Sequence, residues 1–250
     1  MQMRVCLAAG LCLSVLACGV VNGADATVAA KSHSANTPKT RAEADIWWKG
    51  RHEKFNERAR QGNVDLLFLG DSITEGWETF GKNAWAKHFA KRNAANMGIS
   101  GDRTQNVLWR IENGNLEGIK PKLVVLMIGT NNANKQDNTA EEIADGIEAI
   151  VAALRSKLPE SKVLLLGVFP SGVTPNAKRE RTSEVNRIVS HLDDGKSVFY
   201  LDIGPSFVAA DQTISKEIMP DSLHLSPKGY DVWASSIEAK VAELLGEKTS

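Results

Sequence analysis

The chain has 250 residues, of which 42% are apolar, and its 30 basic and 30 acidic residues give a formal net charge of zero. This length and composition are typical of one sizeable globular domain. There is no positive charge excess, no dense Lys/Arg patch and no internal repeat, so the sequence gives no support to a nucleic-acid partner, a solenoid or a propeller.

Residues 1–26 have the pattern of a secretory signal peptide. Arg4 gives a short basic start, Val5–Val21 is an apolar run that is marginal for a membrane span, and small residues around Ala26 offer a cleavage site. We therefore expect a secreted or periplasmic protein without a transmembrane span. All three cysteines lie in this segment. The lipobox-like residues before Cys18 leave a lipid anchor as the less favoured alternative.

Residues 27–39 are rich in Ala, Lys, Ser, Asn and Thr, which predicts a disordered linker before a folded domain at 40–250. Unbroken apolar runs in that domain predict strands buried on both faces, at Val64–Leu69, Asn93–Met97, Leu123–Ile128, Val163–Val168 and Ser197–Ile203. Helical patterns separate them, at Thr40–Phe55, Asp102–Asn113, Thr139–Pro159, Ala177–Leu192 and Pro227–Leu245. The alternation predicts a three-layer α/β sandwich with a parallel sheet, and ligands collect at the carboxyl ends of such strands.

Ser72 follows the first apolar run, in the abrupt turn Gly70-Asp71-Ser72. A serine hydroxyl becomes a nucleophile at neutral pH only when a base takes its proton. The competing interpretation is structural, because the residues from Ser72 to Glu75 have the spacing of a capping box. The two roles are compatible, since the positive end of a helix dipole also favours a nucleophile.

His224 is the histidine that best fits the role of base. It lies in a loop before a helix, three residues after Asp221, whereas the other four histidines lie in the linker or in charged helical stretches. Asp221 would orient the imidazole and stabilise its cation. A turn role after Pro220 competes for Asp221, and Asp202 is the alternative acid. The pairing predicts an acyl-transfer hydrolase.

Acyl transfer also needs hydrogen-bond donors for the developing oxyanion. Loops after three predicted strands offer them in the N–H of Ser72, the glycines Gly98 and Gly101, and the carboxamides of Asn131 and Asn132. Ordinary loop geometry explains each one taken singly, but three such loops together favour a site. The sequence has no His-Glu-x-x-His motif, no close His pair and no Gly-rich phosphate loop, so we predict neither a metal nor a cofactor.

Four sequence blocks carry these candidate residues: the turn at Ser72, the loop from Asn96 to Asp102, the loop from Gly129 to Asn132, and the segment from Asp221 to His224. In this order they resemble the SGNH (GDSL-type) hydrolases over Val64–Tyr230. Within that family they look close to the catalytic subunits of intracellular platelet-activating factor acetylhydrolase. The resemblance implies a flavodoxin-like α/β/α sandwich of about five parallel strands that works without metal or cofactor. It also implies site residues, with Ser72, Asp221 and His224 catalytic and Ser72, Gly101 and Asn131 forming the oxyanion hole.

The expected function is a secreted serine esterase that cleaves short-chain acyl or acetyl esters of a lipid or carbohydrate through an acyl-enzyme. The signal peptide departs from the cytosolic acetylhydrolase subunits, so platelet-activating factor is not the expected substrate. The alternatives are a non-catalytic protein that binds a glycan or lipid in the same cleft and, less favoured, a flavodoxin-like nucleotide binder. Among the tryptophans, Trp77 is expected to line a pocket.

Overall fold

The computed structural model describes residues 2, 32–134 and 137–247, and the predicted signal peptide lies outside these residues apart from Gln2. A single sheet of five parallel strands forms the centre, in the order β2-β1-β3-β4-β5. The strands are β1 Leu66–Gly70, β2 Ala94–Gly98, β3 Leu123–Met127, β4 Lys162–Leu166 and β5 Val198–Leu201. The predicted fold class is confirmed, because each of the five predicted apolar runs overlaps a strand.

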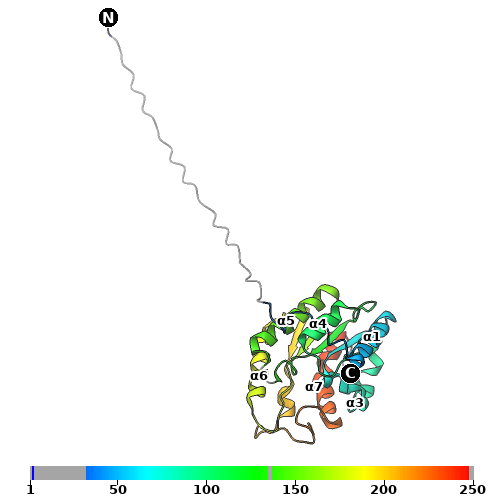
Figure 1. Ribbon diagram of the computed structural model, residues 1–250, viewed down its shortest axis with the longest axis vertical. Coiled ribbons are helices and arrows are strands. Elements are labelled where there is room, and N and C mark those ends of the chain that lie inside the picture. Colours follow the sequence, from blue (N-terminus) through cyan, green and yellow to red (C-terminus); the bar gives the residue numbers. More distant parts are fainter. Residues whose placement is uncertain (1, 3–31, 135–136, 248–250) are drawn as a thin grey trace. The chain divides into compact units, whose positions relative to one another are not determined.

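Helices cover both faces of the sheet (Figure 1). One face packs against α1 Ile46–Arg60, α4 Thr104–Glu112, α5 Ala140–Lys157 and α6 Ala177–Val189. The other packs against α2 Ser72–Glu75, η1 Gly76–Glu78, α3 Lys82–His88 and α7 Pro227–Leu245. The short helices η2 Ala90–Arg92, η4 Ser190–Leu192 and η5 Gly204–Phe207 lie in connections. No helix of the described residues is both long and apolar enough to cross a membrane.

The central strands are apolar without interruption because successive side chains enter opposite cores. In β1, Leu67 and Leu69 join the core on the α5 face, whereas Leu66 and Phe68 join the core on the α7 face. All five residues of β1 are buried. The two cores hold the strand ends in fixed positions, and β1 delivers the chain directly to Ser72.

Two predicted helix starts are wrong. The first helix begins at Ile46 rather than at Thr40, because the carboxylate of Asp45 accepts a hydrogen bond from the Trp48 N–H and caps it. The helix predicted from Asp102 begins at Thr104. The side chain of Asp102 is not a cap, because it is fully buried in contacts with other segments.

Residues 32–39 differ from the expected disordered linker, of which residues 27–31 lie outside the described residues. Ala35 is fully buried, and its carbonyl accepts a hydrogen bond from the Thr104 hydroxyl at 2.7 Å. Lys39 exchanges two hydrogen bonds with α4, donating from its N–H to Gln105 and accepting at its carbonyl from Asn106. A polar composition therefore does not keep this segment unpacked, because its backbone groups form hydrogen bonds with α4.

Candidate active site

The turn after β1 depends on Gly70. A Cβ at this position would lie 2.2 Å from the Thr74 hydroxyl oxygen and 2.4 Å from the Met127 carbonyl oxygen, so only glycine fits. The chain then enters α2, and the carboxylate of Asp71 caps it by accepting from the Ile73 N–H. The capping interpretation of Ser72 is therefore wrong. Ser72 is the first residue of the helix, and its hydroxyl is free for another partner.

That partner is His224. The Ser72 Oγ lies 2.9 Å from the His224 Nε2, and the His224 Nδ1 lies 2.7 Å from the Asp221 Oδ2. Asp202, the alternative acid, is exposed and instead accepts from the Gly204 N–H. The three side chains that the sequence pointed to are therefore adjacent, in the order that a proton relay requires.

The protonation of this chain of contacts follows from Asp221. Burial acts to raise the pKa of this carboxyl, but hydrogen bonds from the His224 ring and from the N–H groups of His224 and Leu223 outweigh burial and lower it. Asp221 is therefore a carboxylate at neutral pH and can only accept, so Nδ1 of His224 carries the proton. The Nε2 of a neutral imidazole is then the acceptor for the Ser72 hydroxyl.

Local hydrogen bonds hold the loop that carries His224. The Asp221 carboxylate accepts from two backbone N–H groups of its own turn, and Ser222 takes a left-handed backbone conformation with φ 65°. The following helix starts with a Ser226 cap and Pro227. The hydroxyl of Tyr230 then donates to the Ile73 carbonyl at 2.6 Å, which ties the helix behind the base to the helix behind the nucleophile.

The two candidate oxyanion glycines differ in whether their N–H groups already have a hydrogen-bond partner. The N–H of Gly98 donates to the Asn96 side chain, and a Cβ there would lie 2.2 Å from the Glu75 nitrogen, so Gly98 lets α2 pack closely. The N–H of Gly101 donates to no group among the described residues, and its φ of +78° favours glycine. The free donor favours Gly101.

The two asparagines also separate. Asn132 is fully buried, and its carboxamide hydrogen-bonds to the start of α4, where its oxygen accepts from the Thr104 N–H. Asn131 is half-buried, and its Nδ2 donates to the Asp102 carbonyl at 2.9 Å and lies 3.5 Å from an Asp71 carboxylate oxygen. The long second contact leaves one amide hydrogen that a ligand can claim, so Asn131 is the better donor.

A small hollow of about 120 Å³ lies beside the nucleophile. Its lining consists of Ser72, Glu75, Gly76, Thr79, Phe80, Ser100, His224 and Tyr230. Trp77 does not line it: this side chain is 1% exposed and packs in the aromatic core against Tyr230 and Trp233. A larger hollow of about 470 Å³ follows β4 and β5 and contains neither Ser72 nor His224.

Sequence reasoning missed two residues of this region. Glu75 closes one side of the hollow, and its carboxylate accepts from the Ser100 N–H at 2.5 Å. Asp71 is fully buried directly before the nucleophile. The capping-box pattern explained this turn as structural. An acid next to a candidate nucleophile could nevertheless have indicated that both belong to the site. Among the described residues, no group of three or more His, Cys, Asp or Glu side chains could hold a metal ion.

Burial raises the pKa of Asp71 to about 7, helped by the nearby Asp102 and opposed by the Ile73 N–H and His224. Between pH 3.8, the ordinary pKa of this carboxyl, and about 7, Asp71 therefore keeps a proton in the folded protein that it releases in the unfolded chain. Because the folded state binds the extra proton, this group makes the free energy of unfolding fall as pH rises between these two values.

We expect the free energy of unfolding of the wild type, minus that of Asp71→Asn, to decrease between pH ~4.5 and ~6.5. The slope should approach about 1.4 kcal/mol per pH unit, because the variant lacks the titrating carboxyl. Urea unfolding of both proteins at a series of pH values measures this difference. Comparing slopes removes any constant cost of placing an amide beside Asn131. A flat or rising difference would contradict the raised pKa.

A family profile described as the GDSL-like Lipase/Acylhydrolase family matches residues 68–232, which contain both the turn at Ser72 and the loop at His224. The chain belongs to this family and is a carboxylic ester hydrolase. It is 38% identical over 224 residues to the platelet-activating factor acetylhydrolase IB subunit alpha2 of Rattus norvegicus, covering 89% of this chain and 94% of the relative.

Two further proteins extend the comparison. The platelet-activating factor acetylhydrolase IB subunit alpha1 of Homo sapiens is 37% identical over 215 residues, covering 86% of this chain and 91% of the relative. The solved structure of a carbohydrate acetylesterase from Sinorhizobium meliloti has a TM-score of 0.58 at 20% identity, covering 72% of this chain and 99% of that one. At this identity the likeness is one of fold.

Proposed function

We propose that this chain is a serine esterase in which Ser72 is the nucleophile, His224 the general base and Asp221 the acid that orients it. The observation that carries the proposal is the 2.9 Å contact between Ser72 Oγ and His224 Nε2, with Asp221 on the opposite nitrogen. A non-catalytic binding protein, the alternative interpretation of the sequence, would have no use for such a relay.

In the first half-reaction, His224 takes the hydroxyl proton of Ser72 while Oγ attacks the ester carbonyl carbon. The tetrahedral oxyanion accepts hydrogen bonds from the N–H groups of Ser72 and Gly101 and from the Asn131 carboxamide. His224 then protonates the leaving alcohol as its C–O bond breaks. In the second half-reaction, His224 takes a proton from the water that attacks the acyl-enzyme carbonyl. It then returns this proton to Ser72 Oγ as the acyl–Oγ bond breaks, and the carboxylic acid leaves.

The hollow at Ser72 favours a short acyl group. Its volume of about 120 Å³ equals about four water molecules at ~30 Å³ each, which suits an acetyl group. The hollow has no room to widen at Gly76, because this residue packs directly against the Tyr230 hydroxyl. A Cβ at Gly76 would lie 1.9 Å from that hydroxyl, and the hydroxyl is itself hydrogen-bonded to the Ile73 carbonyl. Phe80, 59% exposed at the rim, offers an apolar surface to the rest of the substrate.

A panel of 4-nitrophenyl esters tests this size limit. We expect kcat/KM to fall at least about tenfold from the acetate to the octanoate, because a chain that does not fit loses its binding energy. The spontaneous hydrolysis of each ester, measured without enzyme, is the control. Acetylated sugars and acetylated lysolipids, assayed beside the panel, identify the alcohol. A kcat/KM that rises with acyl length would refute the short-acyl proposal.

The proposal includes export from the cell. Its support is the sequence pattern of residues 1–26, with Arg4 before the apolar run Val5–Val21. We expect N-terminal sequencing of protein recovered from the native host to begin near Thr27. A mature chain that still begins at residue 1 would rule out export by this signal.

A further inference from the structure

Carbonyl oxygens around the candidate oxyanion loop accept hydrogen bonds from arginines. Three arginines from three segments bind four of these oxygens, with Arg41 donating to Ser100, Arg51 to Gly98, and Arg110 to Met97 and Gly70. Arg110 is fully buried and bridges the ends of β1 and β2. The last residues of the strands before Ser72 and Gly101 are therefore held together by cations.

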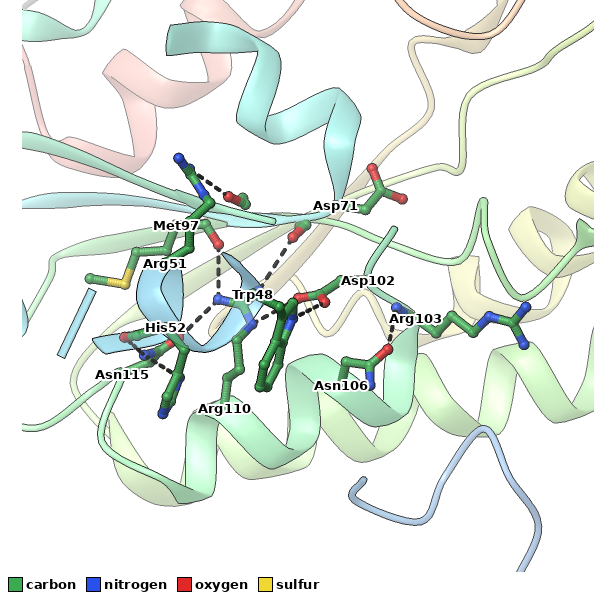
Figure 2. A network of polar contacts seen from close by, with 12 residues as sticks. Trp48, Arg51, His52, Asp71, Met97, Asp102, Arg103, Asn106, Arg110 and Asn115 are labelled. Carbon is green, nitrogen blue, oxygen red and sulfur yellow. Dashed lines mark hydrogen bonds and ion pairs between the residues drawn. The ribbon is translucent and has the colours of Figure 1, made fainter. Parts of the chain in front are cut away.

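Asp102 is the counter-ion of two of these arginines, Arg41 and Arg110, and Figure 2 shows its contacts with Trp48 and Arg110. Its carboxylate accepts from the Trp48 indole N–H at 2.7 Å, pairs with Arg110 at 2.8 Å and accepts from Arg41 at 3.1 Å. Its carbonyl accepts from the Asn131 carboxamide at 2.9 Å. Removing one partner of such a buried pair leaves an uncompensated charge, so the cluster constrains the loop strongly.

The contact of Arg41 is special because of the peptide unit that it binds. Its Nη2 donates to the Ser100 carbonyl at 2.6 Å, and that carbonyl shares one peptide plane with the N–H of Gly101. In a trans peptide the C=O and the N–H point in opposite directions. A guanidinium on the carbonyl side therefore turns the Gly101 N–H away from Arg41.

The same contact strengthens the donor. A charged hydrogen bond to a carbonyl polarises the amide, which makes its N–H a better donor on the other side. A Cβ on Gly101 would lie 2.8 Å from the Arg41 Nη2, so the guanidinium packs directly against this residue. Asp45 and Asp102 hold the guanidinium in turn, at 3.3 and 3.1 Å.

We propose that Arg41 is a positioning residue of the oxyanion hole, which orients and polarises the Ser100–Gly101 peptide for the transition state. This inference rests on the proposed function, because it gives the Gly101 N–H its role toward the oxyanion. Arg41 lies just before α1, at the start of the domain predicted at residues 40–250. These residues before the first helix therefore contribute to the site.

The chain offers a matched control in Arg58, another arginine that donates to loop carbonyls, those of Gly62 and Asn63. These lie before β1, at the opposite end of the strand from Ser72. We expect Arg41→Met to lower kcat about 10- to 100-fold with KM within about threefold of wild type, since full loss of an oxyanion donor costs ~10²–10³. Arg41→Lys should recover part of that loss, and Arg58→Met should stay within about twofold of wild type.

Each variant is assayed per active site, counted with a fluorophosphonate titrant, so that partial unfolding does not enter kcat. Unchanged kcat in Arg41→Met, or a rise in KM alone, would overturn the positioning role. If Arg41→Met does not fold, Arg41→Lys decides, with kcat equal to wild type as the contrary result. A wild-type chain that neither hydrolyses esters nor takes the label would instead refute the proposed function itself, and this inference with it.

Discussion

Replacing Ser72 with alanine should abolish ester hydrolysis and leave the fold intact. We expect kcat to fall at least about 10⁴-fold, because the variant has no oxygen to form the acyl-enzyme and keeps only binding and oxyanion contacts. The free energy of unfolding should change by no more than about 0.5 kcal/mol, since Asp71 and not Ser72 caps the helix. Steady-state kinetics with 4-nitrophenyl acetate and urea unfolding measure the two quantities.

The combination of outcomes is what discriminates. Loss of activity with unchanged stability assigns Ser72 to the chemistry. A Ser72→Ala variant that turns over esters at more than a few per cent of the wild-type rate would exclude Ser72 as the nucleophile. Loss of stability by several kcal/mol would restore the structural interpretation of the serine.

Replacing Asp221 with asparagine should lower kcat by roughly 10²- to 10⁴-fold. A neutral amide no longer fixes the proton on Nδ1 of His224, so Nε2 is presented less often as the acceptor for Ser72. We place the loss below that of a fully buried triad acid, because the Asp221 side chain is 56% exposed and water replaces part of its effect.

Asp202→Asn is the matched control, since Asp202 was the other candidate acid and, among the described residues, hydrogen-bonds only to the Gly204 N–H of its own loop. We expect its kcat to remain within about twofold of wild type. Equal losses in the two variants, or a larger loss at Asp202, would show that the acid had been assigned to the wrong loop.

The sequence predicted the sheet well because β1 and β3 carry apolar residues toward two cores at once. A short unbroken run such as Leu123–Met127 is typical of a strand buried on both faces, and every residue of this run is buried in the structure. Helix starts were harder to predict, because a cap requires a side chain that is free to accept a hydrogen bond from the first N–H groups of the helix. Asp102 lies one residue before the actual cap position, Arg103, and its carboxylate is held by the distant partners Trp48 and Arg110.

The site residues also differ in how far the sequence could predict them. Asp221 and His224 are three residues apart, so their contact is a local property that spacing reveals. The choice between Gly98 and Gly101 is not local, because it depends on which N–H is already bonded and on how α2 packs. Arg41 lies 59 residues from the carbonyl that it binds, and no periodicity links two such positions.

The most direct test of the central claim is to map where an active-site phosphonate binds covalently. A fluorophosphonate reacts with a serine only when a base has activated its hydroxyl. Mass spectrometry of the digested adduct should find a single modified peptide, containing Ser72, with labelling absent after denaturation and strongly slowed in His224→Asn. Labelling at another serine, or none in the active protein, would contradict the Ser72–His224 relay.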